Sequence, residues 1–146
     1  MVKFKILLLL LISSAAMANY MHPGINRLIQ ANDNPTGVVF ELIESDKSTW
    51  VWAAPMIKDL KDQLKAKYPD IEIAVVSHGR EQFQLTKKRA KHQELAISIL
   101  GDLVRKEGVD LHVCGTHSSW YDIPASSYID IVDVAVSGPA KINDYI

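Results

Sequence analysis

The stretch VDLHVCGTH, residues 109–117, decides the fold. Its apolar and β-branched residues favour a strand. The cysteine, glycine and polar residues that follow mark the carboxyl end of that strand. Side chains alternate along a strand, so His112 and Cys114 face one side of the sheet. Leu111 and Val113 face the other side. Cys114 is the only cysteine of the chain, and we take this strand end as the candidate site.

The segments on either side of this strand alternate between strand and helix patterns. Further strands are predicted at residues 37–44, 71–79 and 128–138. Apolar residues at three- and four-residue spacing predict helices over residues 50–68 and from about residue 88 to 106. The first helix is expected to bury Val51, Ala54, Ile57, Leu60 and Leu64, and the second Leu95, Ile99, Leu103 and Val104.

Two residues mark particular positions in these helices. Pro55 is expected in the first turn of the first helix or at a kink there, and Gly108 is expected to end the second. Short strands alternating with helices indicate one α/β domain, residues 37–146, with a small, mainly parallel open sheet and helices on both faces. In such sheets, functional residues collect beyond the carboxyl ends of the strands.

The first 36 residues contain a predicted signal peptide, followed by a predicted extended arm. Two lysines in the first five residues, an apolar run over residues 6–12 and the small residues Ala16 and Ala18 predict a secretory signal peptide, residues 1–18. The apolar run is far shorter than the ~20 residues of a membrane anchor, which is the alternative. We therefore expect a periplasmic protein that is not attached to the membrane after cleavage. Residues 19–36 predict an extended arm, with or without a short helical turn at residues 25–30.

The charge balance predicts no nucleic-acid partner. The chain has 16 Lys and Arg against 17 Asp and Glu, and a formal net charge of −1. A glycine-rich phosphate loop, a paired-carboxylate signature and a serine elbow are all missing from the sequence. We expect no cofactor.

The residues around Cys114 allow two interpretations. A thiolate is favoured by a nearby cation, a helix amino terminus or free backbone amides. His112 and His117 flank the cysteine, and His78 and Arg80, at and just after the end of the strand predicted at residues 71–79, are expected to lie close to it. Ser118 or Ser119 is expected to cap a short helix over residues 120–122. The alternative is a cysteine that acts as a small buried hydrophobe. Cys114, His117 and His78 could also bind a metal, but zinc sites usually have more ligands, and no metal is predicted.

Three segments together carry a family resemblance. The runs AVVSHGREQFQLT (residues 74–86), VDLHVCGTHSSW (residues 109–120) and VDVAVSGPAKINDY (residues 132–145) resemble the DsrE/DsrF-like proteins, in particular an exported subgroup with a single cysteine. The resemblance covers most of the chain from Gly37 onward. It implies a YchN-like fold and a homotrimer or homohexamer. Relatives usually continue after INDY into a glycine-containing final strand, whereas this sequence ends at Ile146.

The resemblance also implies a function for the candidate site. In sulfur-relay members the matching cysteine carries sulfane sulfur as a persulfide, which makes Cys114 the expected carrier. We expect His117 and His78 to act with it, and the residues that bind the ligand to be Ser77, Gly79, Arg80, His112, Gly115 and Thr116. The partners would be sulfur donor and acceptor proteins or small thiols. The second class of function is a non-catalytic binding or assembly module in which Cys114 is structural.

Overall fold

The computed structural model describes residues 22–31 and 34–146 of the 146-residue chain. The predicted signal peptide lies outside the described residues, as do the first three residues of the predicted arm.

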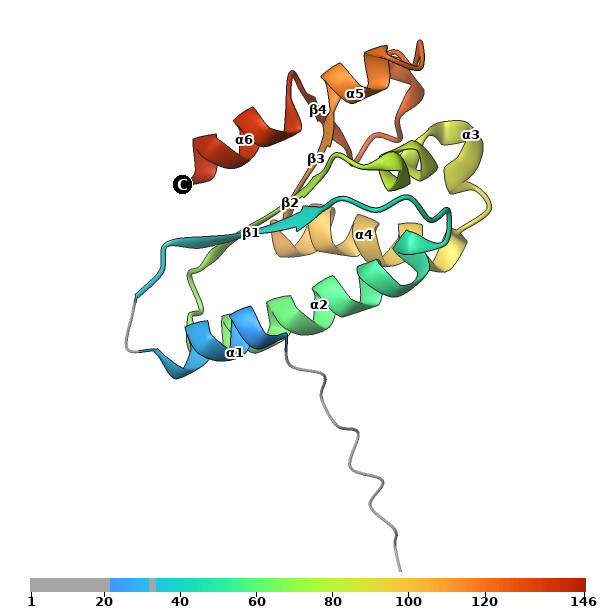
Figure 1. Ribbon diagram of the computed structural model, residues 1–146. Coiled ribbons are helices and arrows are strands. Elements are labelled where there is room, and N and C mark those ends of the chain that lie inside the picture. Colours follow the sequence, from blue (N-terminus) through green and yellow to red (C-terminus); the bar gives the residue numbers. More distant parts are fainter. Residues whose placement is uncertain (1–21, 32–33) are drawn as a thin grey trace, which may run out of the picture.

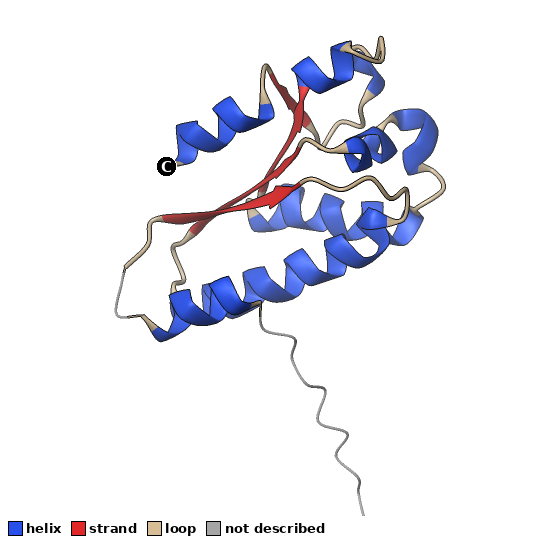
Figure 2. Ribbon diagram, viewed as in Figure 1, coloured by secondary structure: helices blue, strands red, loops and turns tan. Residues whose placement is uncertain are grey.

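The centre of the domain is a parallel sheet (Figure 2). Its four strands are β1 (Gly37–Leu42), β2 (Glu72–Ser77), β3 (Asp110–Cys114) and β4 (Asp133–Ala135), in the order β1-β2-β3-β4. The β2–β3 register pairs Ser77 with Val113, and the β3–β4 register pairs Cys114 with Ala135. The carboxyl ends of β2, β3 and β4 therefore lie side by side, as the predicted α/β class requires.

Helices cover both faces of this sheet, which confirms the predicted fold class. Helices α2 (Thr49–Lys67) and α4 (Glu94–Glu107) lie on one face, and α6 (Gly138–Tyr145) lies on the other (Figure 1). Shorter elements occupy the connections: η1 (Arg80–Leu85), α3 (Lys87–Ala90), α5 (Gly115–Ser119) and η2 (Ala125–Ser127). The main hydrophobic core fills the layer between the sheet and the α2–α4 pair, where Leu64, Leu100, Leu111 and Val113 are almost fully buried.

Helix α2 differs from its prediction in phase. Trp50 is fully buried and its indole donates a hydrogen bond to the Glu81 carbonyl, whereas Val51 is 59% exposed. The helix begins at Thr49, and Pro55 lies beyond its first turn. The buried stripe otherwise contains the predicted alanine, isoleucine and leucines, because their spacing keeps them on one face.

Helix α4 is shorter than predicted. Residues 87–90 form the separate helix α3, and α4 begins only at Glu94. As a result Leu95 is 77% exposed, while Ala96, Leu100 and Leu103 face the core. Gly108 ends the helix as expected, in a left-handed conformation with φ of 69°.

The described part of the predicted arm contains helix α1 (Pro23–Gln30), which is longer than the helical turn allowed at residues 25–30. The Nδ1 atom of His22 accepts a hydrogen bond from the Gly24 amide and caps the helix. Proline in the first turn supports this start, since its missing N–H would have no partner there. Ile25 is buried in the core, and the Tyr68 hydroxyl donates to the Leu28 carbonyl, so α1 is packed onto α2.

Candidate functional site

Cys114 is the last residue of β3 and the N-cap of α5. Its Sγ accepts a hydrogen bond from the His117 amide at 3.4 Å, and its side chain is 5% exposed. The predicted helix over residues 120–122 is wrong: the helix starts at Gly115, immediately after the cysteine, and Ser118 lies inside it. The sulfur thus lies at the amino terminus of α5, within hydrogen-bond distance of a main-chain amide.

Gln82 holds the main chain of Cys114 from both sides. Its Oε1 accepts from the Cys114 amide at 2.8 Å, and its Nε2 donates to the Cys114 carbonyl at 3.3 Å. The Ser118 hydroxyl donates to the same carbonyl at 2.9 Å and contacts the Tyr128 hydroxyl at 2.7 Å. Burial raises the pKa of Tyr128, which keeps this hydroxyl neutral as a hydrogen-bond partner. These contacts fix the position from which the sulfur projects.

Glu81 holds the turn that follows β2. This fully buried carboxylate accepts hydrogen bonds from the Ser77 hydroxyl at 2.7 Å and from the Gly79 amide at 3.0 Å. Its second oxygen accepts from the Glu44 amide at 2.7 Å, so the ends of β1 and β2 are tied to one side chain. A Cβ atom at Gly79 would lie 2.5 Å from the Glu44 nitrogen, which leaves room only for glycine.

The two histidines expected beside the sulfur have other hydrogen-bond partners. The Nδ1 atom of His117 lies 2.9 Å from the His78 carbonyl, and it carries hydrogen there because a carbonyl only accepts. The His117 ring packs against Phe83, Trp120 and Tyr121 at centroid distances of 5.0 to 5.5 Å. The Nε2 atom of His78 pairs with Glu41 at 2.7 Å. The contact from His117 to the thiol is through its amide.

The first turn of α6 lies against both His78 and Cys114. A Cβ atom built on Gly138 would lie 2.6 Å from the His78 Cβ and 3.3 Å from the Cys114 Cβ. Only a residue without a side chain lets the helix approach this closely. The Ser137 hydroxyl caps α6 by accepting from the Ala140 amide at 3.5 Å. Helix α6 is therefore the cover of the cysteine on this face of the sheet.

His112 faces the same side as Cys114 but belongs to a separate network. Its Nδ1 lies 2.8 Å from Asp133, and its Nε2 lies 2.7 Å from the Tyr145 hydroxyl. That hydroxyl also donates to Asp110 at 3.0 Å. Burial, followed by the bond to Asp110, raises the pKa of Tyr145 to about 12. The network ties the end of α6 to β3 and β4.

The remaining predicted residues lie at the rim. Gly115 and Thr116 begin α5, and the Thr116 amide and hydroxyl both donate to the Val136 carbonyl, at 3.0 and 2.7 Å. Arg80 is exposed, and its guanidinium lies 5.8 Å from the centre of the Tyr121 ring. The structure therefore places Ser77, Gly79, Gly115 and Thr116 around the cysteine as framework, and Arg80 farther out.

Sequence analysis missed the residues that position the thiol: Glu81, Gln82, Ser118, Tyr128 and Gly138. For α6 a signal was present, since Ser137 followed by Gly-Pro is a helix start with a capping serine and an early proline. For Glu81 and Gln82 there was none, because a polar run gives no indication of burial.

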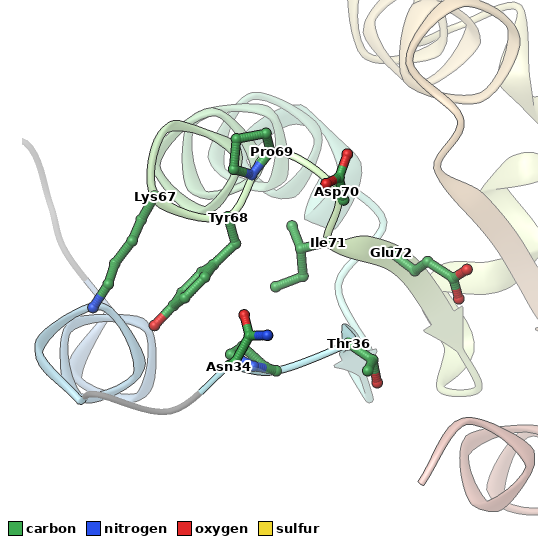
Figure 3. A pocket seen from close by; sticks show the side chains of 9 residues that line it. Asn34, Thr36, Lys67, Tyr68, Pro69, Asp70, Ile71 and Glu72 are labelled. Carbon is green, nitrogen blue, oxygen red and sulfur yellow. The ribbon is translucent and has the colours of Figure 1, made fainter.

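Three further observations concern the rest of the described residues. Within the described residues, no group of three or more His, Cys, Asp or Glu side chains is arranged to bind a metal ion. No helix in residues 22–31 and 34–146 has both the length and the apolar character needed to cross a membrane. A cavity of about 420 Å³ lies at the amino ends of β1 and β2, and Tyr68, Asp70 and Glu72 are among the residues that line it (Figure 3). It is remote from the carboxyl end of β3.

Comparison with known proteins supports the fold alone. No family model matches the chain, and no curated protein matches it. The chain is similar to the solved structure of MTH1491 from Methanobacterium thermoautotrophicum, a protein of unknown function. The TM-score is 0.55 at 20% identity, over 74% of this chain and 88% of the other. The protein thus belongs to a structural class with a small parallel α/β sheet and flanking helices.

Proposed function

We propose that the protein is a sulfur-relay carrier of the DsrE/DsrF-like type, which holds sulfane sulfur as a persulfide on Cys114. One observation supports this above all: the Cys114 Sγ accepts the His117 amide hydrogen at the start of α5. An N–H donor and a helix amino terminus both favour a thiolate over a thiol. Gln82 keeps the main chain of the cysteine fixed while the sulfur reacts.

The transfer step is a displacement at sulfur. The Cys114 thiolate attacks the terminal sulfur of a persulfide donor R–S–SH, and a new S–S bond forms. The S–S bond of the donor breaks, and its electron pair leaves with RS⁻. The products are Cys114–S–SH and RS⁻, so charge, protons and oxidation states balance without a cofactor. An acceptor thiolate then attacks the terminal sulfur in the same way and restores the Cys114 thiolate.

The proposal includes an exported protein that self-associates, as the family resemblance implies. β1 and β4 are the outer strands of the sheet, and Ile43 and Val136, just after them, are exposed apolar residues. Sedimentation of the mature protein is expected to give a trimer or larger assembly. A monomer at micromolar concentration would contradict this part of the proposal, and amino-terminal sequencing of exported material tests cleavage before Asn19.

The direct test uses the single cysteine. We expect incubation with polysulfide or a small-thiol persulfide, followed by intact mass analysis, to show added sulfur that a reductant removes. Cys114→Ser is the matched control, because the chain has no other thiol. If the folded wild-type protein takes up no sulfur from these donors, the carrier proposal is wrong.

One observation favours the alternative, a binding or assembly module with a structural cysteine. The Cys114 side chain is 5% exposed, which is ordinary for a cysteine that only fills space. Alkylation at neutral pH separates the two: a carrier is labelled within minutes by iodoacetamide, whereas a structural thiol is labelled only when the protein unfolds.

A further inference from the structure

A cavity of about 500 Å³ lies beside the candidate site, between the loop after β1, η1 and the turn after α5. We call it the Arg80–Arg89 cavity, after two of the residues that line it. Its volume is within the range of small-molecule sites, roughly 300 to 1,000 Å³. A flat, extended surface would instead suit a protein partner.

The charged residues that line this cavity all have the same sign. They are Lys47, Arg80 and Arg89, and no acidic residue lines it. Among the described residues, none of the three forms an ion pair. The whole chain has a net charge of −1, so the positive charge is local. Three cations around one cavity repel one another, and an anion between them would remove that repulsion.

Gln84 adds an uncharged hydrogen-bonding group to the cavity. Its side chain lines the cavity and is 7% exposed, yet its amide forms no hydrogen bond with any described residue. The neighbouring buried side chains of Glu81 and Gln82, by contrast, are bonded at both of their terminal atoms. The Gln84 amide is therefore available to form a hydrogen bond with a group in the cavity.

An aromatic wall connects this cavity to Cys114. The Tyr121 ring contacts the Phe83 ring at a centroid distance of 5.0 Å and lies under the Arg80 guanidinium. The same ring packs against His117 at 5.5 Å, and the His117 amide donates to the cysteine sulfur. A molecule in the cavity would therefore lie one aromatic side chain away from the helix that begins at the thiol.

We propose that the Arg80–Arg89 cavity binds a small organic anion with at least two negative charges. Arg80 and Arg89 would each pair with an oxyanion group, and Gln84 would form a hydrogen bond to one of them. The identification of this anion as an acidic sulfane-sulfur donor or acceptor rests on the function proposed for Cys114. Binding of the anion itself does not.

The test is a calorimetric titration with isophthalate, a small aromatic dianion, performed on wild type and on Cys114→Ser. Both proteins are expected to bind one isophthalate per chain, with affinity that falls as salt concentration rises. The double variant Arg80→Gln/Arg89→Gln is expected to bind at least about tenfold more weakly, since each charged hydrogen bond contributes about that much. Gln84→Leu is expected to weaken binding without any change of charge.

Lys91→Gln is the matched control, because it removes one positive charge from the same region outside the cavity. The proposal is overturned if Lys91→Gln weakens binding as much as the double variant, or if neutral isophthalamide binds as tightly as isophthalate. Tighter binding of hexaglutamate than of isophthalate would also overturn it, in favour of an acidic protein segment.

The same proteins separate this proposal from the carrier proposal. If isophthalate binds but Cys114 never takes up sulfur, the cavity assignment holds and the carrier is wrong. If Cys114 takes up sulfur but isophthalate does not bind, the carrier holds and the cavity assignment is wrong.

Discussion

Two polar clusters flank the sheet, and they are built differently. The carboxyl-edge cluster, Ser77, Glu81, Gln82, Ser118 and Tyr128, is buried, and most of its hydrogen bonds go to main-chain atoms. The α6 cluster, Asp110, His112, Asp133 and Tyr145, joins side chain to side chain, and both of its carboxylates are exposed. Buried hydrogen bonds to main-chain atoms fix the loops at the ends of the strands. Hydrogen bonds between partly exposed side chains hold helix α6 less firmly.

The two clusters hold different parts of the molecule in place. The carboxyl-edge cluster sets the direction of the Cys114 sulfur, and removal of one of its members leaves buried donors without partners, which is costly. The α6 cluster secures only the cover of the cysteine, and water can replace its bonds. Substitutions in the two clusters should therefore have different magnitudes and different signatures.

The largest effect is expected for Glu81→Ala. The change leaves three donors without an acceptor, on Ser77, Gly79 and Glu44. Each unsatisfied buried donor costs about 1–3 kcal/mol, and we expect the free energy of unfolding to fall by about 3–5 kcal/mol. Urea denaturation measures this. Glu94→Ala, at an exposed position, is the control and should cost less than about 1 kcal/mol. A similar small loss for Glu81→Ala would show that the cluster is not structural.

A smaller effect is expected for Gln82→Leu. The Cys114 amide loses its acceptor, and the free energy of unfolding should fall by about 2 kcal/mol. The rate of Cys114 alkylation should change as well, because the main chain that directs the sulfur is released. Gln30→Leu is the control, because Gln30 is exposed and its side chain forms no hydrogen bond with any described residue. An unchanged alkylation rate would separate Gln82 from the positioning of the thiol.

The smallest effect is expected for Tyr145→Phe, which should lower the free energy of unfolding by at most about 1 kcal/mol near neutral pH. The folded pKa of Tyr145, about 12, is above the ordinary value of 10. The neutral hydroxyl is thus favoured by folding, and its contribution is complete below pH 10 and is lost as pH rises from 10 towards 12.

The pH dependence distinguishes this tyrosine from a side chain that only packs. The difference in unfolding free energy between wild type and Tyr145→Phe should shrink over that alkaline range in urea titrations. Tyr121→Phe is the control for general tyrosine ionisation, because Tyr121 is 48% exposed and its hydroxyl forms no hydrogen bond with any described residue. A difference that stays constant with pH would mean that the hydroxyl does not act through its proton.

The fold could be predicted because it is encoded in repeated patterns. The apolar spacing of residues 50–64 and the alternation of residues 110–114 are expressed along a single segment, so they are visible without any partner. The phase errors at Val51 and Leu95 arose at helix starts, where only one or two turns constrain the pattern.

The site was predictable only in outline. The strand-end position and the glycine after it marked Cys114, but the capping role of its sulfur depends on a helix that starts at Gly115, which has weak helix propensity. The roles of Glu81 and Gln82 depend on contacts 32 to 37 residues away in sequence, with Cys114 and Glu44. Such pairings follow from the register of three strands, which no local pattern specifies.

Helix α6 is expected to limit access to the thiol, because its first turn lies against Cys114. We expect a reagent that approaches Cys114 from this face to require α6 to lift, which makes its observed rate the intrinsic rate multiplied by the fraction of open molecules. Each 1.4 kcal/mol or so of opening free energy lowers that fraction about tenfold. The Gly138 backbone lies directly against the cysteine, and Tyr145 holds the far end of the same helix. We therefore expect the eight residues of α6 to open together. Amide hydrogen exchange of α6 and the labelling of the sulfur should therefore report the same event.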